Sequence, residues 1–209
     1  MKTKALWSLP LAAVLFLSAC NSGSTSSEEK SEKKSASIEA SSLSVDKEAS
    51  RLVWKGEALN LYSHEGTISL KDADLEVADG TISDGQFVVD MTTITPTDEN
   101  YNPEEGSTKQ KLVGHLSSPD FFDVSNYPEA TFDINGYENG TIMGDLSIRG
   151  NTHAETVEDV TIEKNGDRYT ITGTLTFDRK KYDVSWDYPM RDRILSKDIV
   201  INITLAANA

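Results

Sequence analysis

Hydrophobic and polar side chains alternate with a period of two from about residue 51 to the C-terminus. In residues 169–177, threonines alternate with large apolar side chains and one glycine, and residues 199–205 repeat the pattern. A period of two places alternate side chains on opposite faces of a β-strand, so that one face is dry and the other wet. Shorter segments of the same kind lie at residues 52–54, 68–70, 75–77, 87–91, 131–134, 146–148 and 160–162. The pattern predicts eight or nine strands.

Asp-Gly and Asn-Gly pairs accompany these segments. Both residues of such a pair accept positive φ, which tight hairpin turns require. Strands joined by tight turns run antiparallel, and a sheet with one dry face closes as a barrel or packs as a sandwich. We therefore predict an all-β domain. The pairs are Asp79-Gly80, Asp84-Gly85, Asn135-Gly136, Asn139-Gly140 and Asn165-Gly166.

Residues 92–125 interrupt the alternation. Within them, a short helix is predicted near residues 109–116, because Leu112, Val113 and Leu116 would share one side of it. A Ser-Pro turn and the adjacent pair Phe121-Phe122 follow. Neighbouring residues of a strand face opposite ways, so two adjacent phenylalanines suit the mouth or a corner of a barrel better than a regular strand.

The N-terminus has the layout of a secretory signal, with two lysines, an apolar run over residues 5–17 and small residues before Cys20. The ending Leu-Ser-Ala-Cys at 17–20 resembles the lipobox of bacterial lipoproteins. That resemblance implies cleavage before Cys20, a diacylglycerol on its thiol, and further acyl chains such as palmitate. The alternatives are an ordinary signal peptide with a coincidental cysteine, or an uncleaved anchor. We expect residues 1–19 to be the signal peptide.

After Cys20, serine dominates to about residue 50, no aromatic residue occurs, and Glu and Lys alternate with small side chains. Such a segment buries too little apolar area to offset the entropy of ordering, so residues 20–50 are predicted to be the lipidated cysteine and a flexible tether. Residues 51–209 then form one domain. Residues 1–50 contain six lysines and six acidic residues, so residues 51–209 carry the whole net charge of −14.

Composition excludes several classes of protein. An acidic domain lacks the basic surface of a general nucleic-acid binder. A single cysteine excludes an internal disulfide and a multi-cysteine zinc site. His64, His115 and His153 have no metal-motif spacing, and no nucleophile elbow or phosphate-binding glycine loop occurs. The sequence therefore predicts neither a metal nor a resident cofactor and makes no positive case for an enzyme. A hydrolase using His64 or His115 with a nearby carboxylate is kept as a third hypothesis.

The dry face of the sheet is the remaining candidate site. A barrel of about eight strands is either filled by its own side chains or holds one small ligand, and periodicity alone leaves both open. Nearly all the inward candidates are apolar, so a resident ligand would be apolar too. The candidates are Trp54, Ile68, Leu70, Phe87, Val89, Phe132, Ile134, Leu146, Ile148, Ile171, Leu175, Phe177, Ile201 and Ile203.

Several blocks, in this order, resemble the YceI-like family of lipocalin-like, polyisoprenoid-binding proteins secreted by bacteria. They lie between Ser50 and Ala207: SRLVWKG at 50–56, SHEGTI at 63–68, GHLSSPDFFDV at 114–124, YPEATF at 127–132, GDLSIRGNT at 144–152 and FDRKKY at 177–182. The resemblance implies an extended antiparallel β-barrel with one short helix near the mouth. It also implies that an isoprenoid or other lipid-like chain is held in the lumen without being chemically changed, and that Phe121 and Phe122 line the entrance.

The chain departs from the family pattern after Tyr182, where Asp183 stands in place of the usual glycine and the loop over residues 184–197 is short. Arg191 or Arg193 could meet an anionic head group such as a pyrophosphate there. A solvated loop is the favoured interpretation, and we transfer no head-group residue from the family.

The leading hypothesis is an exported lipoprotein, anchored to a bacterial membrane (the outer one in a Gram-negative source), that carries or sequesters an isoprenoid, a quinone or a fatty-acid-like molecule. The expected partners are that ligand and the membrane, without nucleic acid. The oligomeric state is left open, a homodimer included. The alternative is a non-enzymatic interaction or stress module of the envelope, with a packed barrel and no ligand.

Overall fold

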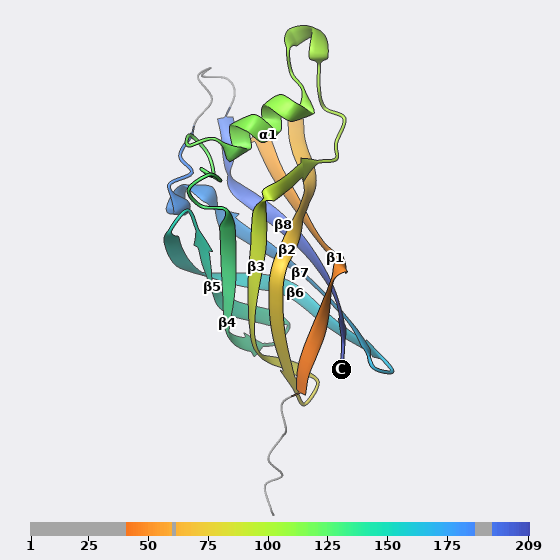
Figure 1. The fold of residues 1–209 in the computed structure, drawn as a ribbon. Coiled ribbons are helices and arrows are strands. Elements are labelled where there is room, and N and C mark those ends of the chain that lie inside the picture. Colours follow the sequence, from red (N-terminus) through yellow and green to blue (C-terminus); the bar gives the residue numbers. More distant parts are fainter. Residues whose placement is uncertain (1–40, 60–61, 187–193) are drawn as a thin grey trace, which may run out of the picture. The chain divides into compact units, whose positions relative to one another are not determined.

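Eight antiparallel strands close into one barrel (Figure 1). The computed structural model describes residues 41–59, 62–186 and 194–209. Each strand pairs with its neighbour in the chain, and the last pairs with the first, which closes the sheet. The predicted barrel of about eight strands with one short helix is confirmed. The strands are β1 (Ser41–Leu59), β2 (Tyr62–Ala78), β3 (Thr81–Pro96), β4 (Glu129–Glu138), β5 (Thr141–Ile148), β6 (Asn151–Asn165), β7 (Arg168–Asp178) and β8 (Ile194–Asn208).

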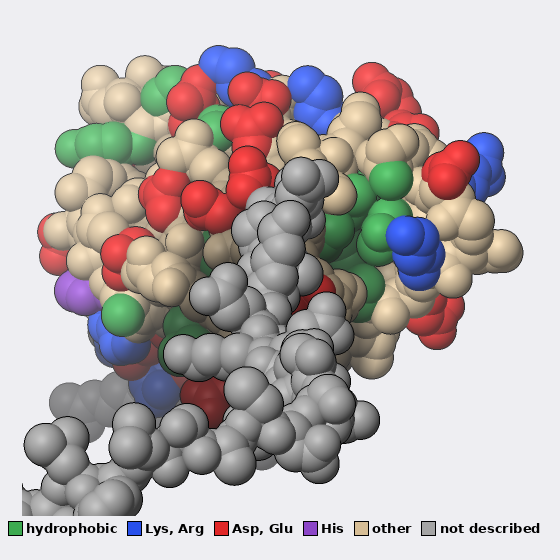
Figure 2. Space-filling view, turned by 90° about the horizontal axis from the view of Figure 1, so that it is seen from below, with side chains coloured by type: hydrophobic (Ala, Val, Ile, Leu, Met, Phe, Trp, Pro, Cys, Tyr) green, Lys and Arg blue, Asp and Glu red, His purple; other side chains and the backbone are tan. Residues whose placement is uncertain are grey.

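The alternation read from the sequence sorts the side chains between the inside and the outside of the barrel. Along β7, Tyr169, Ile171, Leu175 and Phe177 are buried, whereas the threonines between them are exposed or half-buried. Acidic side chains are spread over the exterior, as the face in Figure 2 shows. The predicted segments at 68–70 and 75–77 are two parts of one long strand, β2.

The first strand begins earlier than the composition indicated. β1 starts at Ser41, which pairs with Val77 of β2, and Leu43 is almost fully buried. The boundary predicted between residues 50 and 51 is therefore wrong, because residues 41–50 belong to the barrel. Their side chains are mostly polar and exposed, and it is backbone pairing with β2 and β8 that orders them.

Three of the five predicted turns lie between strands. Asp79-Gly80 and Asn139-Gly140 have positive φ at both residues, as a tight hairpin requires, and Gly166 turns between β6 and β7. Asp84-Gly85 lies inside β3 and Asn135-Gly136 inside β4, so those two predictions are wrong. Gly85 is needed for close packing: a Cβ there would stand 2.9 Å from the carbonyl oxygen of Asp74.

The helical elements lie toward one end of the barrel (Figure 1). Helix α1 (Lys109–Ser117) forms over the predicted residues and begins where the Thr108 side chain accepts a hydrogen bond from the backbone N–H of Lys111. The 3₁₀ turns are η1 (Pro103–Glu105) and η2 (Arg179–Tyr182). Within the described parts of the chain, no helix combines the length and apolar character that a membrane span requires.

Candidate functional site

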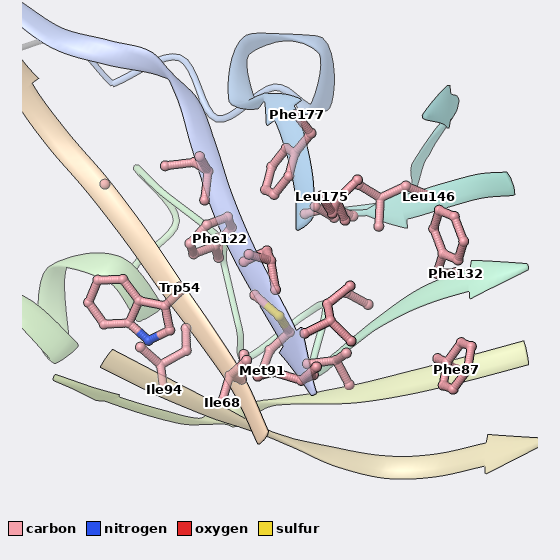
Figure 3. Close-up of a pocket in the computed structure, with 18 of the residues that line it drawn as sticks. Trp54, Ile68, Phe87, Met91, Ile94, Phe122, Phe132, Leu146, Leu175 and Phe177 are labelled. Carbon is pink, nitrogen blue, oxygen red and sulfur yellow. The ribbon is translucent and has the colours of Figure 1, made fainter. Parts of the chain in front are cut away.

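A long apolar cavity runs through the barrel (Figure 3). The volume of the cavity that the centres of water molecules can occupy is about 290 Å³. A cavity needs only roughly 10–15 Å³ of such volume to hold one water molecule. The barrel is therefore not filled by its own side chains. Periodicity alone could not distinguish a packed interior from a hollow one, and the structure has the hollow one.

All sixteen residues that the sequence predicted for the lumen and its entrance line this cavity. They come from every strand except β6 and from the turn after α1, and Figure 3 shows many of them pointing inward. The residues are Trp54, Ile68, Leu70, Phe87, Val89, Phe121, Phe122, Phe132, Ile134, Leu146, Ile148, Ile171, Leu175, Phe177, Ile201 and Ile203. Their proposed role in binding a lipid stays a prediction.

Other lining residues were missed by the sequence analysis. Several extend the same alternation beyond the predicted residues, by two positions or, for Ile142, by four, and this pattern was the available signal: Leu52, Ile142, Ile199 and Leu205. Trp186 and Leu195 fall in residues 184–197, which the sequence analysis interpreted as a short loop; Leu195 belongs to β8, and Trp186 lies outside any strand. Arg191 and Arg193 lie outside the described residues, as do Cys20 and the rest of residues 1–40.

Helix α1 contributes Leu112, His115 and Leu116 to the wall of the cavity. No residue of the helix is fully buried. Leu112 and Leu116 were predicted to share a face, and they do so on the side that lines the lumen. The helix therefore lies at the mouth of the barrel and contributes partly buried apolar side chains to the wall of the cavity.

Phe121 and Phe122 stand next to the helix in a turn that Arg149 holds in place. Nη1 of Arg149 donates to the carbonyl oxygens of Phe121 (2.7 Å) and Asp183 (2.8 Å), and Nη2 donates to that of Pro119 (3.0 Å). The two phenylalanine rings meet edge to face at 4.9 Å between centroids. One guanidinium thus positions the aromatic side chains that line the entrance and also ties them to the residues after η2.

A second arginine, Arg179, is completely buried beside the same entrance. Its Nε donates to the carbonyl oxygen of Ser196 (2.9 Å), and its Nη1 donates to that of Val184 (2.5 Å). The side chain therefore joins η2 to the start of β8. The guanidinium also lies 6.0 Å from the ring centroid of Phe121.

His64 and Asp98 form a hydrogen-bonded pair near the mouth, between β2 and the segment that follows β3. Nδ1 of His64 lies 3.1 Å from Oδ1 of Asp98, and the Tyr101 hydroxyl donates to Oδ2 over 3.1 Å. The Tyr101 ring stacks on the imidazole at 5.0 Å. Of these three side chains, only His64 lines the cavity.

The carboxylate of Asp98 is held in its charged form. Burial alone would raise its pKa, but hydrogen bonds from the backbone N–H groups of Asn100 and Glu65 and from His64 outweigh that effect and lower the pKa. Burial, followed by the negative charge of Asp98, raises the pKa of the Tyr101 hydroxyl, which therefore stays protonated and can donate.

His115 lies on the cavity side of α1 in a different environment. Its ring meets Trp186 edge to face at 4.4 Å and Phe121 at 5.4 Å between centroids. Its Nε2 atom is buried and has no hydrogen-bond partner among the residues that the structure describes. Burial lowers the pKa of His115, against a smaller opposing effect of Asp120.

The third histidine lies on the outer wall. His153 is exposed, and its Nε2 lies 2.9 Å from the carbonyl oxygen of Lys181. Within residues 41–59, 62–186 and 194–209, no cluster of His, Cys, Asp and Glu could hold a metal ion.

Comparison with known proteins places the fold. A sequence model described as YceI-like domain matches residues 43–207. A UPF0312 protein of Staphylococcus epidermidis is 28% identical over 154 residues, which are 69% of this chain and 83% of that protein. A UPF0312 protein of Staphylococcus aureus is 28% identical over 132 residues, 58% of this chain and 72% of that one.

Two solved structures share the barrel. BcnA of Burkholderia cenocepacia matches with a TM-score of 0.63 at 22% identity, over 78% of this chain and 99% of BcnA. A polyisoprenoid-binding domain from Saccharophagus degradans matches with a TM-score of 0.51 at 12% identity, over 82% of this chain and 99% of that domain. At these identities the two structures establish a common fold.

Proposed function

Because the chain belongs to the YceI-like domain family, we propose that it binds one long apolar chain, of the isoprenoid or another lipid-like kind, inside its barrel. The bound molecule is carried or sequestered at the cell envelope and is not chemically changed. The polyisoprenoid-binding domain from Saccharophagus degradans has the same fold, which supports this class of ligand.

The open, apolar lumen is the observation that carries the proposal. Its wall is built mainly from aliphatic and aromatic side chains of all eight strands, so a molecule inside it would be held by apolar contact along its length. A lumen of this size, bordered by apolar groups, offers van der Waals contacts to an apolar chain along its whole length. The alternative function, an interaction or stress module of the envelope, assumes a packed barrel, so the cavity counts against it.

Anchoring at a membrane would bring the barrel to the place where such ligands occur. The proposed anchor is a diacylglycerol on Cys20, supported by the apolar run before it and by the lipobox-like residues 17–20. The test is metabolic labelling with a radioactive fatty acid. We expect the wild-type chain to be labelled and Cys20→Ser to lose the label; equal labelling of both would overturn the anchor.

A hydrolytic function has one point in its favour, the contact between His64 and Asp98. In the described parts of the chain, however, no serine, threonine or cysteine is hydrogen-bonded to His64. An oriented imidazole without a nucleophile is half of a hydrolytic site. We therefore propose binding without catalysis.

Native mass spectrometry of the full chain, purified from its host, tests the proposed function directly. We expect a co-purified molecule whose fragmentation identifies a long apolar chain. A wild-type protein that carries no such molecule and takes up no isoprenoid quinone would contradict the proposal.

The control is a pair of variants one residue apart on β1. A side chain at Gly56 would enter the cavity, since a Cβ there would lie 3.5 Å from Cδ1 of Ile199, an ordinary contact. Glu57 is exposed on the outer face. Gly56→Phe should lower the fraction of protein that carries the molecule, whereas Glu57→Phe should leave it unchanged.

A further inference from the structure

The ring of His115 leaves a buried polar atom without a partner in the wall of the lumen. In the part of the chain that the structure describes, Nε2 of His115 is the only buried side-chain nitrogen or oxygen that makes no hydrogen bond. Buried polar groups are almost always hydrogen-bonded, because an unpaired group costs the free energy of desolvation and no hydrogen bond compensates for it. The position of this atom therefore needs a reason.

The neighbours of the imidazole hold it but do not satisfy it. Trp186 and Phe121 meet the ring edge to face, and Leu112 and Leu116, on the same helix, line the cavity beside it. Such packing restricts the rotamer of His115, while apolar side chains give Nε2 nothing to bond. His64 differs, because its Nδ1 is already bonded to Asp98.

The charge state of the ring limits what it can bind. Burial lowers the pKa of His115 and Asp120 only partly opposes this, so the imidazole is neutral at neutral pH. A neutral imidazole presents one N–H donor and one acceptor nitrogen, which suits a hydroxyl or carbonyl oxygen. A carboxylate or a diphosphate at the same place would be a buried charge without a compensating cation from this ring.

We propose that Nε2 of His115 is the hydrogen-bonding contact for an uncharged hydroxyl or carbonyl oxygen at the head of the apolar chain in the lumen. The inference rests on the proposed function and adds two statements to it. The ligand is oriented, with its head at α1 and its tail along the barrel, and the site prefers a neutral head to an anionic one.

Three probes with the same branched sixteen-carbon backbone test the inference: phytol with a hydroxyl, phytanic acid with a carboxylate, and phytane with no head group. Their affinities for the full chain are measured by displacement of a fluorescent apolar dye, with each probe delivered from the same cyclodextrin. The variants are His115→Phe, which keeps the ring packing and removes Nε2, and His115→Gln, whose amide nitrogen reaches a similar place. His153→Phe makes the same substitution on the outer wall and is the control.

We expect His115→Phe to weaken the affinity for phytol by about 3- to 10-fold, which corresponds to the loss of one hydrogen bond. The affinity for phytane should be unchanged. His115→Gln should bind phytol with an affinity within about twofold of wild type, and His153→Phe should change the affinity for neither probe. Without ligand, His115→Phe should melt at the wild-type temperature or above it, because the substitution removes an unpaired polar atom.

The results that would overturn the inference differ from those against the proposed function. If His115→Phe weakens the affinities for phytol and phytane equally, the residue only packs against the ligand. If the affinity for phytol is unchanged, Nε2 makes no contact with the head group. A larger loss for phytanic acid than for phytol would overturn the preference for a neutral head. Wild-type protein that binds neither phytol nor phytane would remove the proposed function, and this inference with it.

Discussion

Nδ1 of His64 lies 3.1 Å from Oδ1 of Asp98, a contact between two residues 34 positions apart in the chain. The same carboxylate accepts hydrogen bonds from the backbone N–H groups of Glu65 (3.1 Å) and Asn100 (2.9 Å). One side chain thus fastens the segment that leaves β3 to the start of β2. This connection leads to α1 and so to the mouth of the lumen.

Replacing Asp98 should destabilise the protein in a way that depends on pH. The folded state lowers the pKa of Asp98, so the carboxylate stabilises the fold above the ordinary carboxyl pKa, and this contribution is lost as the pH falls through the folded value. Asp98→Asn should cost about 1–3 kcal/mol at pH 7. Thermal melts from pH 7 to pH 2 check this. The gap between variant and wild type should close at the acid end, and a constant gap would contradict the assignment.

Two glycines of the barrel should respond oppositely to the same substitution. A Cβ on Gly66 would clash with the carbonyl oxygen of Thr95 and stand 2.5 Å from the Trp54 ring, whereas a Cβ on Gly56 meets only Ile199 at 3.5 Å. We expect Gly66→Ala to destabilise by about 1–3 kcal/mol. Gly56→Ala should be neutral or stabilising by about 0.5–1 kcal/mol, since a glycine within a strand is unfavourable. Urea unfolding measures both, and equal effects would be inconsistent with the strand packing.

Neighbouring positions on β7 test which face of the barrel is inside. Leu175 is buried and lines the cavity, and Thr176 is exposed. Leu175→Arg would place an unpaired charge in the lumen, at a cost of several kcal/mol, so we expect loss of the folded protein or a large fall in its melting temperature. Thr176→Arg should change stability by less than about 0.5 kcal/mol. Similar melting temperatures for the two variants would mean that the register is wrong.

Arg149 should control the order of the entrance turn. Its guanidinium spans three carbonyl oxygens, those of Pro119, Phe121 and Asp183, and a lysine ammonium cannot reach all three at once. We expect Arg149→Lys to cost about 1–3 kcal/mol and to speed amide hydrogen exchange around Phe121 and Phe122.

The same replacement at the exposed Arg168 is the control and should change neither quantity. Hydrogen exchange at Phe121 that is as slow in Arg149→Lys as in wild type would show that the turn holds its shape without the guanidinium.

The inward face of the barrel was the most predictable feature. All sixteen lumen residues proposed from periodicity and family resemblance line the cavity, Leu175 and Phe177 among them. Alternation of side chains is a local property of every strand, so it can be read without knowing which strands are neighbours. The helix at 109–117 was equally predictable, because its apolar residues recur at helical spacing.

Features that depend on distant pairing were not predictable in the same way. Residues 41–50 look like a tether because their side chains are polar, yet they are strand, since β2 and β8 supply backbone partners. Asp84-Gly85 has the composition of a turn and lies within β3, where the glycine permits close approach to the neighbouring strand. Local composition does not report what the backbone is bonded to.

The sequence by itself determined which side chains face inward, because strand geometry alternates them residue by residue. Only the tertiary structure decided that β8 closes on β1 and that the closed barrel keeps an open lumen. It also decided that His115, in the wall of that lumen, has a buried ring nitrogen without a hydrogen-bond partner among the described residues. The volume of a cavity and the partners of a buried atom depend on how distant side chains fit together in three dimensions, which no local pattern along the chain contains.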